Sequence, residues 1–180
     1  AGVAHAAGAS LARRVVSPVR REVEVFRFST TRLDLRENST RTTAALHALW
    51  AARGHGKAAG SEEPPPVAGT EWREWLLAEL ARPRRPGEPS VALPGDAAET
   101  LGMFRIVPEL RDGVDREAIG SFVLSMTRSV NDVLGAYLLA KEAGLFDDPA
   151  ATESCTLPIV PLFETIDDLQ RAPQMMKELL

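Results

Sequence analysis

The chain has 180 residues, 44% hydrophobic and 26% charged, with a formal net charge of -4 at pH 7, which is ordinary for a soluble globular protein and argues against a dedicated nucleic-acid binder. No apolar run approaches the length that crosses a bilayer, and the Ala-rich start lacks the ordered regions of a signal peptide, so we expect neither a nucleic-acid nor a membrane partner. The single cysteine, Cys155, excludes an internal disulfide and fits a reducing, cytoplasmic location.

The two ends of the sequence indicate a piece of a longer protein. It begins in an Ala/Gly stretch without methionine, and it stops at Leu180 while the last predicted helix is still periodic. We therefore expect residues 1–180 to form a single segment of a larger domain.

The N-terminal part predicts a connector, a strand and a helix. Val15–Arg21 is interrupted by proline and predicts a short connector, whereas the β-branched and aromatic residues of Glu22–Leu35 predict one strand. The strand is expected to end at Arg36. A helix then begins, with Ser39 or Thr40 as its N-cap.

The middle of the chain predicts two helices and a loop. Arg53–Gly69 contains several glycines and three consecutive prolines, which predicts a surface loop. Glu71–Leu80 predicts a helix whose two tryptophans have helical spacing, so we expect them in the core and not in a ligand-stacking platform. Asp96–Val107 predicts a further helix that Pro108 ends.

The C-terminal part contains two units of strand followed by helix. Ser121–Met126 predicts a short apolar strand, and Ser129 with Asp132 forms a capping-box pattern that opens a helix ending at Gly144. The apolar run Leu157–Phe163 predicts a strand buried on both faces. Glu164 follows it directly.

A second capping-box pattern comes immediately after Glu164. Thr165 and Asp168 have the Thr-x-x-Asp spacing, so a helix is expected to begin there. The chain therefore predicts an α/β fold of three βα units with a helical insertion after the first.

Polar side chains are expected at the ends of all three strands. Arg36, Arg128 and Glu164 would face a common crevice if the strands are parallel. Two guanidinium groups and a carboxylate suit an anionic ligand held by bidentate contacts, with a metal bound to the acid. The alternatives are that each arginine forms a surface ion pair and that Glu164 only interacts with the dipole of the next helix.

Four blocks of the sequence resemble those of phosphoenolpyruvate carboxylase, in that family's order. They are Phe28–Ser39, Glu71–Leu80, Ser121–Leu134 and Val160–Leu169, of which the last is the most specific. The resemblance covers roughly Val23 to Leu180. It implies a segment of a catalytic (β/α)8 TIM barrel with extra helices, mostly helical overall.

The resemblance also implies an activity and a site. Enzymes of this family add bicarbonate to phosphoenolpyruvate with Mg2+ or Mn2+, giving oxaloacetate and phosphate. Bicarbonate attacks the phosphoryl group, and the metal steadies the pyruvate enolate while carbon dioxide is captured. By matching motif, Glu164 falls on the metal-binding glutamate and Arg36 on the arginine that contacts the substrate phosphate; Arg128 is a further substrate-binding candidate from its strand-end position alone.

We therefore expect a fragment of a cytoplasmic carboxy-lyase that serves carbon dioxide fixation and the replenishment of the tricarboxylic acid cycle. The parent enzyme is expected to be a homotetramer, as is usual in the family. The fragment alone is expected to be inactive, because the family's catalytic histidine, its Gly/Arg-rich loop and the aspartate that completes the metal site find no match here.

The sequence also departs from the family within one of the matching blocks. Glu37 and Asn38 stand where the family commonly has Gln-Glu, and Thr42 stands where it has a histidine. Two other readings stay open: another metal-dependent barrel enzyme acting on phosphoenolpyruvate or pyruvate, which would need a phosphate-cradling lysine, and a non-catalytic helical interaction module.

Overall fold

The computed structural model describes residues 8–26, 32–55, 63–83, 90–146 and 154–179. Two compact units are present, Ala1–Arg32 and Leu33–Leu180. In the described ranges, no helix combines the length and the apolar character that a membrane span requires.

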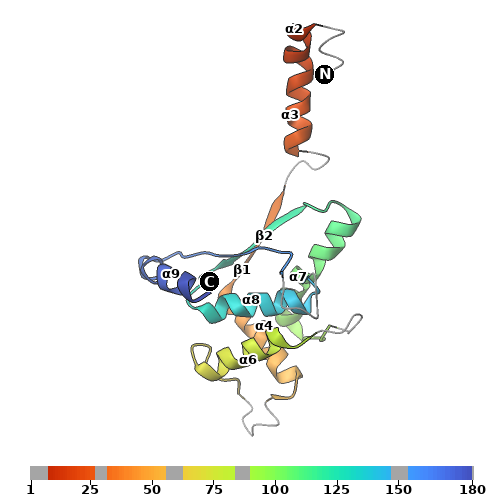
Figure 1. Ribbon diagram of the computed structural model, residues 1–180. Coiled ribbons are helices and arrows are strands. Elements are labelled where there is room, and N and C mark those ends of the chain that lie inside the picture. Colours follow the sequence, from red (N-terminus) through yellow and green to blue (C-terminus); the bar gives the residue numbers. More distant parts are fainter. Residues whose placement is uncertain (1–7, 27–31, 56–62, 84–89, 147–153, 180) are drawn as a thin grey trace. The chain divides into compact units, whose positions relative to one another are not determined.

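The first unit is helical from Ala9 to Phe26 (Figure 1). This stretch consists of α2 (Ala9–Leu11), the π-helical turn η1 (Ala12–Val16) and α3 (Ser17–Phe26). The predicted connector at Val15–Arg21 is therefore wrong. The π turn ends at Val16, two residues before Pro18, which has no N–H to donate, so the regular bonding pattern is interrupted close to this turn.

The strand predicted from Glu22 is wrong over the part that the structure describes. Residues 22–26 are the end of α3, and an ion pair of 2.6 Å joins Arg20 Nε to Glu24 Oε1 one turn apart. Residues 27–31 of the prediction lie outside the described ranges, and only its last part, from Leu33, is a strand. The β-branched residues favoured a strand, but their spacing also gives α3 an exposed apolar side, which includes Val19 and Val23.

The second unit is built on a parallel sheet. Its described strands are β1 (Leu33–Asn38), β2 (Ile119–Ser125) and β3 (Ile159–Pro161), in the order β1-β2-β3. The α/β class and the three predicted βα units are confirmed. A small parallel sheet among helices is consistent with part of a barrel.

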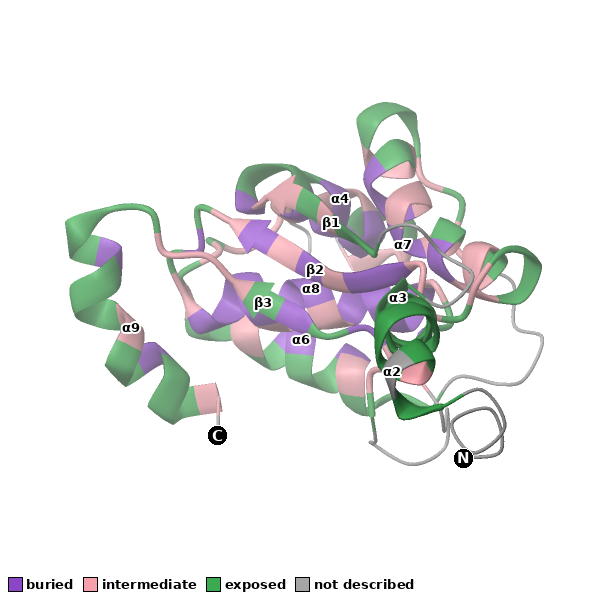
Figure 2. Ribbon diagram, turned by 90° about the horizontal axis from the view of Figure 1, so that it is seen from above, coloured by how far each residue is buried: buried purple, intermediate pink, exposed green. Residues whose placement is uncertain are grey.

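Helices cover one face of this sheet (Figure 2). The helices of the second unit are α4 (Ser39–Ala52), α6 (Thr70–Ala81), α7 (Gly95–Gly113), α8 (Val130–Glu142) and α9 (Ile166–Leu179). α4, α7 and α8 each contact the sheet, and α6 packs on α8. Phe122 and Leu124 of β2 point into this layer and are fully buried.

The opposite face of the sheet is open in the part that the structure describes. Arg36, Val123 and Val160 are register partners on the three strands, and they alternate with the buried residues that face the helices. Val160 is 42% exposed, so the expectation of a third strand buried on both faces is wrong for this chain. The strand is also shorter than predicted.

The helix predicted at Glu71–Leu80 is confirmed as α6, and its tryptophans are in the core. Trp72 is fully buried and Trp75 nearly so, with their ring centroids 4.6 Å apart. The predicted end of the next helix at Pro108 is wrong, because α7 continues through it to Gly113. Val107 and Leu110 pack on the core on either side of the proline, and this packing keeps the segment helical.

The predicted loop at Arg53–Gly69 begins with a residue that is not on the surface. The Arg53 guanidinium is largely buried and forms ion pairs with Glu79 and, at 2.5 Å, with Glu142. It therefore links the ends of α4, α6 and α8. Residues 56–62 of the loop lie outside the described ranges.

Candidate functional site

The candidate site lies where the three parallel strands end and the next helices begin. The Asn38 side chain caps α4 by accepting a hydrogen bond from the Thr40 N–H at 2.8 Å, where the sequence had predicted Ser39 or Thr40 as the cap. Both predicted capping boxes are confirmed. The Ser129–Asp132 box opens α8, and the Thr165–Asp168 box opens α9, with Thr165 just before the helix and Asp168 in its first turn.

In the second capping box, the pKa of the Asp168 carboxyl is lowered. Hydrogen bonds from Thr165, followed by the bond and charge of Arg171, lower the pKa of the Asp168 carboxyl although burial opposes this. The Thr165 hydroxyl lies 2.6 Å from Asp168 Oδ2, and the Arg171 guanidinium lies 2.8 Å from Oδ1. The carboxylate therefore fixes the direction in which the chain leaves β3.

Glu164 lies between β3 and α9 and reaches back to the neighbouring strand. Its Oε2 accepts a hydrogen bond from the Met126 N–H at 2.9 Å, just past the end of β2. The strand pairing continues to this point, because Leu162 N–H donates to the Leu124 carbonyl at 2.9 Å. The carboxylate is therefore hydrogen-bonded to the backbone at the end of β2. An interaction with the helix dipole alone would not require this contact. Its residue is exposed to solvent.

Arg36 is placed differently from the prediction. It lies inside β1, paired in register with Val123, and the strand continues to Asn38 because the ladder with β2 continues to Ser125. The residue is exposed on the open face of the sheet. In the described residues its guanidinium forms no ion pair, whereas neighbouring Glu37 pairs with Arg41 at 3.3 Å.

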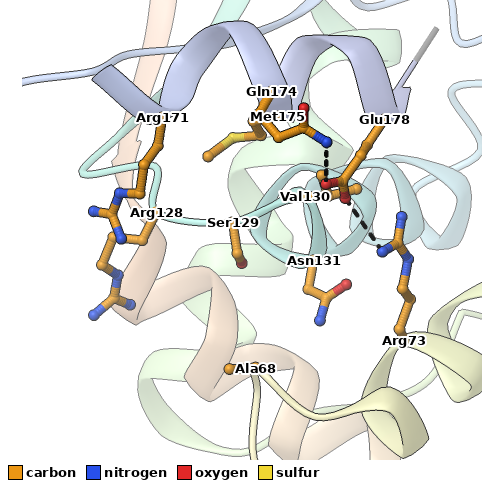
Figure 3. Close-up of a pocket in the computed structure, with 10 residues that line it drawn as sticks. All are labelled: Ala68, Arg73, Arg128, Ser129, Val130, Asn131, Arg171, Gln174, Met175 and Glu178. Carbon is orange, nitrogen blue, oxygen red and sulfur yellow. Dashed lines mark hydrogen bonds and ion pairs between the residues drawn. The ribbon is translucent and has the colours of Figure 1, made fainter. Parts of the chain in front are cut away.

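Arg128 borders a pocket that Arg36 and Glu164 do not line (Figure 3). The pocket has a volume of about 300 Å³ and lies between the start of α8, α9 and the start of α6. Two further arginines border it, but Arg171 is paired with Asp168, and Arg73 lies 3.4 Å from Glu178. The common crevice expected for the three strand-end residues stays a prediction.

The described residues do not by themselves form a complete metal site. They contain no group of three or more His, Cys, Asp and Glu side chains that could hold an ion. Glu164 fits as one ligand, since it is an exposed carboxylate with one oxygen held by an amide and a hard cation prefers such oxygens. His47 does not fit, because its ring packs edge-on against the fully buried Trp72.

Sequence reasoning missed two residues beside Glu164. Met126, with φ of 56°, has left-handed backbone, and its carbonyl accepts a hydrogen bond of 2.7 Å from the hydroxyl of Ser39. Ser39 had been considered only as a helix cap. No local pattern signals a left-handed methionine or a contact between residues 87 positions apart.

The fold and site define a class: an α/β protein of parallel βα units in which the Glu164 carboxylate is bound at the carboxyl end of the neighbouring strand. The family model described as phosphoenolpyruvate carboxylase matches residues 2–180. The chain belongs to the phosphoenolpyruvate carboxylase family.

Several relatives agree with this assignment. The chain is 62% identical to the phosphoenolpyruvate carboxylase of Methylorubrum extorquens over 99% of its own length and 19% of that protein's. It is 39% identical to that of Synechococcus sp. (strain WH7803) and 37% identical to that of Thermosynechococcus vestitus, in each case over 88% of the chain and 15% of the relative. The chain thus spans a fifth or less of the length of these curated relatives.

Proposed function

We propose that this chain is part of an enzyme that carboxylates phosphoenolpyruvate with bicarbonate to give oxaloacetate and phosphate. The observation that carries the proposal is the family match over nearly the whole chain, together with the Glu164 carboxylate held at the strand ends. All 180 residues would belong to the catalytic domain of a carboxy-lyase, and the segment would be inactive without the remainder.

Glu164 would supply one oxygen ligand to Mg2+ or Mn2+. One of its oxygens is occupied by the Met126 amide, so the other is available to a cation. The remaining ligands would come from outside this chain, since the described residues provide no further cluster of acids or histidines. When bound, the cation supplies positive charge that stabilises an enolate oxygen.

Arg36 would bind and orient the phosphoryl group of the substrate. Its guanidinium is exposed and is not committed to an ion pair with any described residue, so its donors are available. The planar fork matches two phosphoryl oxygens, and it would hold the phosphorus where bicarbonate attacks. Arg128, which is also exposed, would make a further contact to the substrate.

The open face of the sheet supports a larger barrel in the parent. Arg36, Val123 and Val160 lie on the face that the described helices leave uncovered. In a (β/α)8 barrel this face is the interior and the helices form the outer layer. We propose that strands outside this segment close the barrel, and that the parent is a cytoplasmic homotetramer without a nucleic-acid or membrane partner.

The proposal is tested with the full-length parent and Glu164→Gln. The assay measures oxaloacetate formation, by coupled reduction to malate, while Mn2+ is varied at saturating phosphoenolpyruvate and bicarbonate. An amide is a weaker ligand for a hard cation, so we expect a large rise in the Mn2+ concentration needed for half-maximal activity. A parent that forms no oxaloacetate from these substrates contradicts the activity. An unchanged Mn2+ titration for the variant contradicts the role of Glu164.

A further inference from the structure

The residue that holds Glu164 has an unusual backbone. Among the described residues, Met126 is the one non-glycine residue with positive φ, at 56°. A residue with a Cβ atom seldom adopts the left-handed region, and such conformations persist where the surrounding structure determines them. The left-handed conformation of Met126 therefore needs an explanation in the residues that surround it.

Two hydrogen bonds hold the two sides of Met126. Its N–H donates to Glu164 Oε2 at 2.9 Å, and its carbonyl accepts from Ser39 Oγ at 2.7 Å. Ser39 is the first residue of α4 and is fully buried, so its hydroxyl has a fixed position. Met126 is 38% exposed, so its side chain is not enclosed by the core.

These contacts join all three strand ends in one chain of hydrogen bonds. Ser39 follows β1, Met126 follows β2 and Glu164 follows β3. The residue after Met126 is also fixed, because Thr127 N–H donates to the Leu162 carbonyl at 3.2 Å and its hydroxyl to the Leu124 carbonyl at 2.7 Å. The peptide group between Met126 and Thr127 is thus held at its carbonyl and at its N–H, which fixes the backbone next to the Met126 N–H that donates to the carboxylate.

We propose that Ser39 and Met126 are positioning residues that orient the Glu164 carboxylate for binding a divalent cation. The inference rests on the proposed role of Glu164 as a metal ligand. A glutamate side chain has three torsions, and a fixed amide at one oxygen restricts them so that the other oxygen keeps its direction. Partners that orient a metal ligand typically change metal affinity by roughly 10- to 100-fold when they are lost.

Because Met126 acts through its backbone, variants at this position should differ in Mn2+ affinity in a specific order. Met126→Gly adopts positive φ without steric cost, so it should keep the amide in place. Met126→Val resists positive φ because its side chain branches at Cβ, so it should move the amide. A role of the methionine side chain itself predicts a different order, in which both variants lose function.

The experiment measures Mn2+ binding to the full-length parent by electron paramagnetic resonance, with the melting temperature recorded for each variant. We expect Met126→Val and Ser39→Ala to weaken Mn2+ binding roughly 10- to 100-fold, and Met126→Gly to stay within about threefold of the original. Ser125→Ala is the matched control. It removes a neighbouring hydroxyl that donates to the Glu37 carbonyl at 3.1 Å and does not belong to the chain of bonds, so it should leave Mn2+ affinity unchanged.

Glu164→Gln separates this inference from the function on which it rests. If Glu164→Gln binds Mn2+ as tightly as the original, the metal role of Glu164 fails, and the positioning role with it. If Glu164→Gln loses Mn2+ but Met126→Val and Ser39→Ala retain it, the positioning inference alone is overturned. Equal weakening by valine and glycine at position 126 also overturns it, as does equal weakening by Ser39→Ala and Ser125→Ala.

Discussion

Arg36→Lys in the full-length parent tests the proposed phosphate contact. Arg36 is exposed on the open face of the sheet, and its guanidinium forms no ion pair with a described residue. Lysine keeps the positive charge on a long, unbranched side chain of smaller volume, so the substitution introduces no steric overlap on this face. We therefore expect the variant to fold, so that a loss of activity reports on the substrate.

The size of the effect follows from the geometry of the two side chains. Lysine keeps the charge but cannot offer the planar pair of donors that matches two phosphoryl oxygens. The loss of one charge-assisted hydrogen bond costs about 1.5 to 3 kcal/mol, which lowers kcat/KM for phosphoenolpyruvate by about ten- to a hundredfold. Turnover should also fall, since a misplaced phosphoryl group is a poorer target for bicarbonate. The KM for bicarbonate should change much less.

Steady-state kinetics with each substrate varied in turn measures these parameters. Arg41→Lys is the control, because Arg41 lies five residues further on and is engaged in surface ion pairs with Glu37 and Glu99, each at 3.3 Å. It should leave both Michaelis constants unchanged. An equal loss toward both substrates in Arg36→Lys, with a lowered melting temperature, refutes the reasoning and makes Arg36 a structural residue.

Three further outcomes concern stability. The isolated segment should aggregate, because one sheet face is uncovered in its described part, and its purification as a cooperatively unfolding monomer would contradict this. Gly135→Ala should lower the stability of the parent in thermal melts by about 1–3 kcal/mol, since the new Cβ would lie 2.4 Å from Leu46 Cδ1, whereas Gly102→Ala, with open space, should not lower it. The pKa of Asp168 in the folded protein is below its ordinary value of 3.8, so the stability that its charge contributes is present above pH 3.8 and is lost as the pH falls through the lower folded value. The difference in melting temperature between the original protein and Asp168→Asn should therefore shrink over that acidic range. A constant difference would argue against this role of the charge.

Local patterns predicted much of the second unit. Both capping boxes and the α6 helix are determined by side chains within a few residues of each other, so the sequence shows them directly. The errors at Arg36 and Pro108 arose where distant contacts decide. Arg36 was expected to end a strand because polar residues follow it, but pairing with β2 extends the ladder to Asn38. Pro108 was expected to end α7, but core contacts on both sides of it keep the helix.

The candidate site likewise contains features that local sequence patterns predict and features that depend on distant contacts. Glu164 could be predicted from a strand and a capping box on either side of it, which are both local. The Ser39 hydroxyl that fixes the Met126 carbonyl comes from 87 residues earlier in the chain. The left-handed conformation of Met126 could not be predicted either, because methionine has no preference for that region of backbone conformation. Such support can be found only once the register of the strands is known.

The strand register also relates the two proposed ligand-binding residues to each other. Arg36 pairs with Val123, two residues before the end of β2, whereas Glu164 binds the amide of Met126, one residue after it. Val123 and Met126 are three residues apart, which is about 10 Å along the strand at about 3.3 Å per residue. The backbone of Arg36 therefore lies about 10 Å further from the carboxyl ends of the strands than the Met126 amide that holds the Glu164 carboxylate. A long side chain is needed to cover most of that distance, and arginine is among the longest. A shorter donor at position 36 would leave the phosphoryl group below the level of the cation, so the proposed site requires reach at this position as well as charge.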